Sequence, residues 1–218
     1  MGCSACEPLA IATAYQLVYE AGHSRQVRLR AGTPAQSLIA DYFADSVDVE
    51  VLVCSSGVAA RKTALEQVGG FPVGVRAGED LITWARLACL GEVAYSAEGT
   101  TYVSAPAHAA DKRRTAVRTP DRADYIGDAL AELARANPER ARSIERHLAW
   151  CYRIRALAYA EIGESSQSFR EIRKAIAVGR PTMRDGMIAI LSAMPRKARA
   201  HLLAQYRVRR SRRHAERP

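Results

Sequence analysis

The sequence predicts an α/β segment, residues 1–119, followed by an all-α helical-hairpin segment, residues 120–218. Before residue 119, short runs of β-branched and aromatic residues alternate with polar ones, as half-buried strands do. After that point, longer stretches with helical periodicity are separated by single prolines and glycines. With 218 residues, 48% of them hydrophobic, the chain can form one large domain or two small ones with a packed core.

Turn chemistry and helix signals divide the first segment. Thr33-Pro34 combines a capping hydroxyl with a proline suited to a first helical turn, which predicts a helix as far as Ala44. Gly69 and Gly70 predict the end of a short helix, because glycine readily takes positive φ. In order, we expect strands at residues 11–19 and 26–30, a helix at 33–44, a strand at 47–54, helices at 62–68 and 80–90, and one or two strands within 92–103.

In the helix expected at residues 80–90, apolar residues lie on one side. Leu81, Trp84, Ala85 and Ala88 are spaced i, i+3, i+4 and i+7, which gives a stripe that packs against a core.

In the second segment, the sequence pattern predicts helices at residues 121–136, 139–162, 166–178 and 196–213. The second and third of these, joined at Gly163, resemble one tetratricopeptide-like hairpin. A single hairpin does not make a repeat array, since about three repeats are needed for a continuous core.

Composition indicates an anionic partner. The formal net charge is +9, and the basic excess is concentrated in residues 196–217. The five cysteines are scattered and odd in number, which fits a reducing cytosol and argues against a disulfide framework. No apolar run approaches the roughly 20 residues of a membrane-spanning helix, and we find no secretory signal.

The residues most informative about function lie between Ser55 and Ala88. They are Ser55-Ser56, Arg61, Ala64-Leu65, Val68-Gly69-Gly70-Phe71, Gly78-Glu79-Asp80, Trp84 and Arg86-Leu87-Ala88. This combination resembles the acceptor-side, C-terminal half of the family 2 glycosyltransferase catalytic domain, over about residues 11–108. The resemblance implies part of a GT-A fold. It also implies transfer of a hexose-type sugar from a nucleotide-sugar donor to a sugar or lipid-linked acceptor, as in cell-envelope polysaccharide biosynthesis.

The resemblance assigns the catalytic base to Asp80, which would take the proton from the acceptor hydroxyl in an inverting displacement. A carboxylate at a helix N-terminus is stabilised in its ionised form by the free backbone amides and the helix dipole. The same physics allows a purely structural alternative, in which Glu79 and Asp80 only complement that dipole. Glu79 either orients the acceptor or caps the helix.

Four of the five further candidate residues have two interpretations each. Ser55 and Ser56 either donate hydrogen bonds to a sugar or cap a turn. Arg86 binds a phosphate or forms a structural ion pair, and Trp84 stacks on a sugar or belongs to the core. The resemblance makes His108 a candidate metal ligand, although the sequence around it departs from the family pattern.

Several departures from the family limit the expected activity. Pro72 and Ile82 stand where acids are common, and the nucleotide-binding half with its metal-gripping Asp-x-Asp is absent from the chain. The complete enzyme is expected to use a divalent metal, Mg²⁺ or Mn²⁺, so this chain alone should lack activity. It is then a fragment, a degenerate relative that retains acceptor binding, or one of two subunits.

The alternative hypothesis is a non-catalytic helical interaction module. Its basic tail, residues 196–217, would bind an anionic membrane surface or remain solvated. Nucleic acid is an unlikely partner, since no nucleic-acid-binding motif is present. We therefore expect a cytoplasmic protein, peripheral on the inner face of the membrane where the tail binds lipid.

Overall fold

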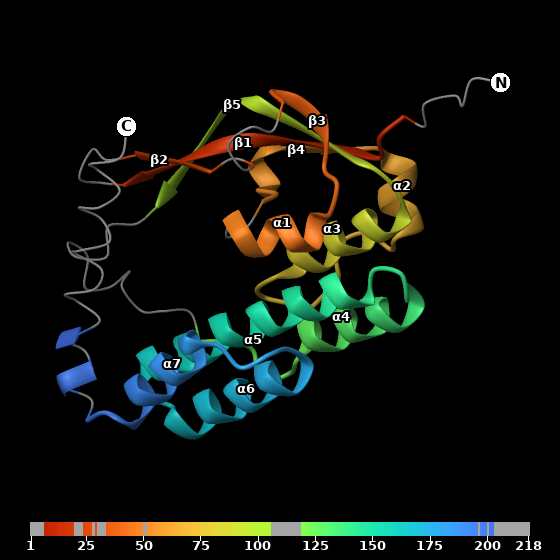
Figure 1. Ribbon diagram of the computed structural model, residues 1–218. Helices are drawn as coiled ribbons and strands as arrows, with labels where there is room; N and C mark the ends of the chain where they lie inside the picture. The colour runs from red at the N-terminus through yellow and green to blue at the C-terminus, as the bar shows by residue number, and fades with distance from the viewer. Residues whose placement is uncertain are drawn as a thin grey trace.

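A computed structural model describes residues 7–19, 24–27, 29, 34–49, 52–105, 119–195, 197–199 and 201–202, and structural statements below concern these residues. An α/β region comes first and helices follow, as predicted (Figure 1). The elements are β1 (Ala10–Tyr19), β2 (Ser24–Val27), β3 (Gln36–Leu38), α1 (Tyr42–Val49), the 3-10 turn η1 (Ser55–Gly57), β4 (Val58–Ala60), α2 (Lys62–Gln67), α3 (Glu79–Leu90), β5 (Val93–Ala105), α4 (Tyr125–Ala136), α5 (Ala141–Ile162), α6 (Ser165–Val178) and α7 (Met183–Ala193).

The five described strands form one mixed sheet. Four of them follow the order β2-β1-β5-β3, and β4 pairs with β1 beside this path. β1 and β5 are parallel, whereas β2 and β4 both pair antiparallel with β1 and share its other edge. β3 closes the far edge, antiparallel to β5. The register of the central pair shifts between Thr13 and Tyr15. This sheet forms the upper layer in Figure 1.

Helices cover one face of the sheet. α1 and α3 lie directly beneath it, and α4–α7 form a further layer below them (Figure 1). Trp84, Ala85 and Ala88 of α3 are buried, which confirms most of the predicted apolar stripe. The main hydrophobic core also includes Ile144 and Leu148 of α5. It is therefore built from residues on both sides of position 119, and residues 106–118 lie outside the described part.

None of the described helices covers the opposite face of the sheet (Figure 1). One row of residues in register crosses four strands, formed by Ala59, Ile11, Ala94 and Leu38. Ile11 is 47% exposed and Leu38 is 49% exposed. Parallel strand pairs are usually covered on both faces, so this uncovered apolar row is unusual.

Two predictions within the first segment are wrong. Residues 36–38 form β3 instead of a helix, and residues 47–49 belong to α1 instead of a strand. The helix begins later because Asp41 caps it: Oδ1 accepts hydrogen bonds from the amides of Phe43 and Ala44, at 3.0 and 3.1 Å. Phe43, 1% exposed, then anchors α1 in the core.

The predicted hairpin of α5 and α6 is present. Gly163 ends α5 with φ of 95°, a left-handed conformation that favours glycine. Ser168 Oγ on α6 donates to the Ala156 carbonyl on α5 at 2.7 Å. The sequence did not predict α7, which packs beside this hairpin through a small core that includes Ile188. The first helix of the second segment also starts later than predicted, at Tyr125.

Candidate functional site

The first turn of α3 brings two predicted site residues together. Gly78 precedes the helix with φ of 84°, and Asp80 follows within the first turn. Asp80 Oδ2 accepts a hydrogen bond from Ser55 Oγ at 2.9 Å, and Oδ1 accepts one from the Leu81 amide at 2.8 Å. The Ser55–Asp80 hydrogen bond is exposed to solvent, and the residue Asp80 itself is partly buried. A carboxylate and a hydroxyl from distant segments therefore meet at the protein surface.

The turn that carries Ser55 is held by two central strands. Thr13 Oγ1 of β1 donates to the Gly57 carbonyl at 3.2 Å, and Thr101 Oγ1 of β5 donates to the Ser56 carbonyl at 3.5 Å. A Cβ on Gly57 would lie 2.9 Å from Thr13 Oγ1. Any larger residue would have to displace the Thr13 side chain, so glycine favours the close approach of the turn to β1.

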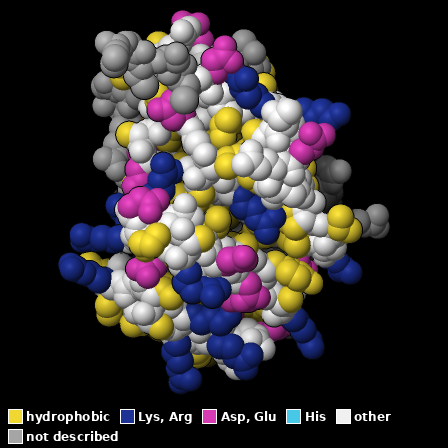
Figure 2. Space-filling model, turned by 90° about the vertical axis from the view of Figure 1, so that its right-hand side faces the viewer, with side chains coloured by type: hydrophobic (Ala, Val, Ile, Leu, Met, Phe, Trp, Pro, Cys, Tyr) yellow, Lys and Arg dark blue, Asp and Glu magenta, His cyan; other side chains and the backbone are white. Residues whose placement is uncertain are grey.

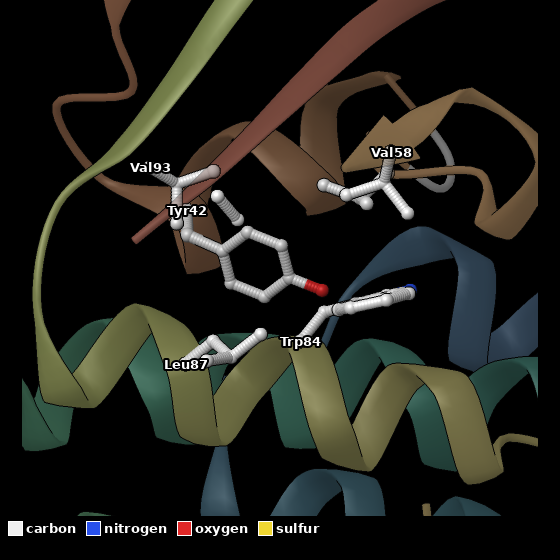
Figure 3. A pocket seen from close by; sticks show the side chains of 7 residues that line it. Tyr42, Val58, Trp84, Leu87 and Val93 are labelled. Carbon is white, nitrogen blue, oxygen red and sulfur yellow. The ribbon is translucent and has the colours of Figure 1, made fainter. Parts of the chain in front are cut away.

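A small apolar cavity lies beside the turn and α3 (Figure 3). Its volume is about 10 Å³, room for about one water molecule. Tyr42 projects between Val58 and Trp84 from α1. Burial raises the pKa of the Tyr42 hydroxyl above its usual range, and the charge of Asp80 acts in the same direction. The Tyr42 hydroxyl thus stays a neutral group near the Asp80 carboxylate.

Trp84 lies in the core instead of at the surface. Its side chain is 6% exposed, and its ring meets Phe71 edge-on, with centroids 5.5 Å apart. Its indole nitrogen has no hydrogen-bond partner among the described residues. In this arrangement Trp84 positions the loop before α3, and its ring face does not offer a stacking surface.

Arg86 lies on another side of α3 from Asp80. It follows Asp80 by six residues, and because two whole helical turns take about seven, the two side chains leave the helix in different directions. Arg86 Nη1 donates a hydrogen bond to the Val68 carbonyl at 3.3 Å. It lines an open hollow of about 270 Å³ together with Val68, Cys89, Leu90 and Leu133. This hollow does not include Asp80. Arg86 therefore acts on the end of α2, away from the Ser55–Asp80 contact.

Ser56, Glu79 and His108 are the remaining predicted site residues. Ser56 neighbours Ser55 in η1, but its carbonyl is the group that Thr101 holds. The Glu79 carbonyl accepts from Thr83 Oγ1 at 2.9 Å as part of the helix turn. His108 lies outside the described residues. Among those described, no group of three or more His, Cys, Asp or Glu side chains is arranged to hold a metal ion.

Lys/Arg and Asp/Glu side chains are interspersed with apolar ones on the face shown in Figure 2. Of the basic tract at 196–217, the structure describes residues 197–199 and 201–202. Arg199 is only 4% exposed, and a Cβ added to Gly163 would lie 3.2 Å from its Nη2. Arg199 is thus packed beside the C-terminal end of α5, where a cation is favourable, and is not part of a solvated tract.

No protein-family model, curated protein or solved structure matches this chain.

Sequence reasoning missed the residues that support Ser55. Thr13 and Thr101 are ordinary strand residues in sequence, and only the parallel pairing of β1 with β5 brings them to the turn. Tyr42 falls within the helix expected at residues 33–44, and nothing in the sequence connected it with Asp80. No local pattern marks these three residues, because their contacts depend on the sheet topology.

Proposed function

We propose that this chain is the acceptor-binding half of an inverting, family 2-like glycosyltransferase. The contact between Ser55 Oγ and Asp80 Oδ2, at 2.9 Å, is the observation that carries the proposal. It joins the residue proposed as catalytic base to a residue proposed to bind the acceptor, across 25 positions of sequence. A hydroxyl already donates to this carboxylate, so an acceptor hydroxyl can take the same geometry.

The proposed chemistry is a single displacement. Asp80 accepts the proton of the acceptor hydroxyl while that oxygen forms a bond to the anomeric carbon of the donor sugar. The bond from this carbon to the phosphate oxygen breaks, and the nucleoside diphosphate leaves with the bonding electrons. Ser55 positions the acceptor, because its hydroxyl can donate either to Asp80 or to the incoming oxygen.

Two structural observations are consistent with a nucleotide-binding half supplied by another polypeptide segment. The first is the exposed apolar row on the outer face of the sheet, around Ile11 and Leu38. A second layer packed there would cover the parallel β1–β5 pair in the usual way. The second concerns the divalent metal of the complete enzyme. The described residues do not fit it, since they offer no cluster of three or more ligands.

Acceptor binding can be tested with the chain alone. We would titrate ¹⁵N-labelled protein with glucose, N-acetylglucosamine and octyl glucoside and follow the backbone amide shifts. The proposal expects shifts confined to residues 54–57 and 78–81. Asp80→Asn should weaken binding by about tenfold, as expected for a hydrogen bond to a charged group.

Asp128→Asn is a matched control for that titration. Asp128 is also a carboxylate in the first turn of a helix, but that helix is α4. The control should bind the sugars as the wild type does. Amide shifts located elsewhere, or equal affinities of the Asp80→Asn and wild-type proteins, would remove the Ser55–Asp80 site from acceptor binding.

A further inference from the structure

The outward side of α7 consists of apolar residues and glycine. Met183 is 95% exposed, Ile190 67% and Met187 48%. These side chains are spaced i, i+4 and i+7 and therefore lie along one side of the helix. The only other exposed residues of α7 are Gly186 and Ala193. A surface helix normally turns its polar side to water, so this exposed apolar side is unusual.

Two polar residues of α7, Asp185 and Ser192, instead face inward. Asp185 is buried and forms an ion pair with Arg153 of α5 at 2.7 Å. Ser192 Oγ lies 2.7 Å from Ser168 Oγ of α6 and is also buried. These contacts fix the rotation of α7. The helix cannot turn its methionines inward without leaving a buried charge unpaired, which is strongly unfavourable.

Positive charge flanks this apolar strip. Arg180 precedes α7 and Lys197 follows it, and both are exposed, while Arg184 is half-buried on its side. In the sequence from residue 179 to residue 202, Asp185 is the only acid, and its charge is already paired with Arg153. One exposed acid, Glu164, lies near the C-terminal end of the strip. Its position follows from its neighbour Ser165, whose hydroxyl donates to the Ser192 carbonyl. The strip is therefore apolar along its length and cationic at both ends.

We propose that α7 docks on the surface of an anionic phospholipid membrane. Met183, Met187 and Ile190 would enter the boundary between headgroups and acyl chains, and the flanking cations would lie near the lipid phosphates. Methionine suits this role because its flexible, polarizable side chain adapts to irregular surroundings. None of the described helices combines the length and the apolar character needed to cross a bilayer, so the contact is peripheral. This inference does not depend on the proposed transferase function.

Charge favours a membrane over the other occupants of such a strip. A symmetric contact with a second copy would place the cations around Arg180 and Lys197 of both copies at one interface, where like charges repel. Nucleic acid binds basic proteins through its phosphates and would leave the exposed methionines in water. An anionic lipid surface satisfies the apolar strip and its cations together.

Vesicle sedimentation tests the proposal with the full chain. We expect binding to vesicles of phosphatidylcholine with phosphatidylglycerol, no binding to phosphatidylcholine alone, and weaker binding as salt increases. The triple variant Met183→Ser/Met187→Ser/Ile190→Ser should bind about tenfold or more weakly, because it loses three apolar side chains that would be partly buried in the lipid. Leu38→Ser/Val73→Ser removes exposed apolar side chains from the sheet and a loop, and should bind as wild type does.

Two further variants separate charge from insertion. Arg180→Gln should weaken binding by about fivefold, the contribution of one cation near the lipid, whereas Arg142→Gln, an exposed arginine of α5, should not. Met187→Trp should show a blue shift of tryptophan emission with anionic vesicles only.

Three results would overturn the inference. One is that the wild type ignores anionic vesicles. Another is that the triple variant binds them as tightly as the wild type does. The third is that light scattering shows the wild type to be a dimer and the triple variant to be a monomer, which would assign the strip to a contact with a second copy.

Discussion

Arg153 of α5 donates two hydrogen bonds to Asp185 of α7, from Nε to Oδ1 at 2.7 Å and from Nη2 to Oδ2 at 3.1 Å. Both side chains are largely buried. Oδ2 of the same carboxylate accepts from the Thr182 amide and hydroxyl, which caps α7. Burial acts to raise the pKa of Asp185, but the bonds from Arg153 and Thr182 outweigh it and lower the pKa. One paired carboxylate thus both starts α7 and fixes its orientation.

Breaking this pair should destabilise the protein. Arg153→Met leaves the Asp185 charge buried without its partner, which typically costs about 3–5 kcal/mol in the free energy of unfolding. Urea denaturation measures the change. The double variant Arg153→Met/Asp185→Leu should recover much of the loss, since no buried charge remains. Lys62→Met breaks the exposed pair with Glu66 and should cause no measurable change; equal losses in both single variants would contradict this account.

His147 should make stability depend on pH. The ring is 1% exposed and packs against Phe43 and Trp150, with centroids 5.9 and 5.5 Å away. Its nitrogens have no hydrogen-bond partner of good geometry among the described residues. Burial lowers its pKa to about 4 from the ordinary 6.5. The unfolded chain therefore takes up a proton first, and stability falls as the pH drops from about 6.5 towards 4, by about 3 kcal/mol at most.

His147→Phe tests this dependence. Phenylalanine retains an aromatic ring at this position but cannot be protonated, so the loss between pH 7.5 and pH 4.5 should shrink relative to wild type. The measurement is the urea midpoint at both pH values. Trp150→Phe serves as a control in the same cluster, because it changes packing without changing a titratable group. An unaltered pH dependence in the His147 variant would assign the acid sensitivity to other residues.

The sequence was informative where local pattern and tertiary contact agree. The apolar spacing of α3 and the glycines after α2 identified both elements, because those signals depend on neighbouring residues alone. The start of α1 was misplaced because Thr33-Pro34 and Asp41 are both valid capping signals, and the burial of Phe43 decides between them. α7 was missed because apolar residues occupy two of its sides, which leaves no single stripe.

The candidate site was only partly predictable for a related reason. Asp80 could be placed at a helix N-terminus from its neighbours, and the resemblance associated Ser55 with it. The contacts from Thr13 and Thr101 that hold the Ser55 turn depend on the pairing of β1 with β5. Trp84 was a candidate for sugar stacking as well as for the core, and its burial favours the core. The sequence could not show that Arg86 contacts the end of α2.

Gly78 couples the site to α4 and should not tolerate a side chain. Its φ is 84°, and a Cβ there would lie 2.4 Å from Ile126 Cδ1. Gly74 has the same φ with nothing within 4 Å, so Gly74→Ala should cost only the backbone strain, about 1 kcal/mol. Gly78→Ala should cost about 1 kcal/mol more because Ile126 must move. Ile126→Val removes Cδ1, so adding it to Gly78→Ala should recover that extra loss in thermal or urea unfolding.

In the proposed transferase, Asp80→Asn should abolish sugar transfer while leaving the fold intact. The asparagine retains the shape of the side chain and can still accept from Ser55, but it cannot take the acceptor proton. Loss of a general base lowers the rate by about 10²–10⁴-fold. The assay would combine this chain with a polypeptide that supplies the nucleotide-binding half and follow release of nucleoside diphosphate from UDP-glucose, UDP-N-acetylglucosamine or GDP-mannose.

Ser55→Ala separates the contribution of the Ser55 hydroxyl from that of the Asp80 carboxylate. The alanine variant retains the base but loses one donor, so turnover should fall less than in the Asp80 variant, by about tenfold. Asp128→Asn again serves as the control for a first-turn carboxylate elsewhere, and it should transfer sugar at the wild-type rate. Thermal unfolding of every variant checks that the fold is intact. If Asp80→Asn turns over at the wild-type rate, the proton is taken by another group, and the hydrogen bond from Ser55 to Asp80 serves only to join η1 to α3.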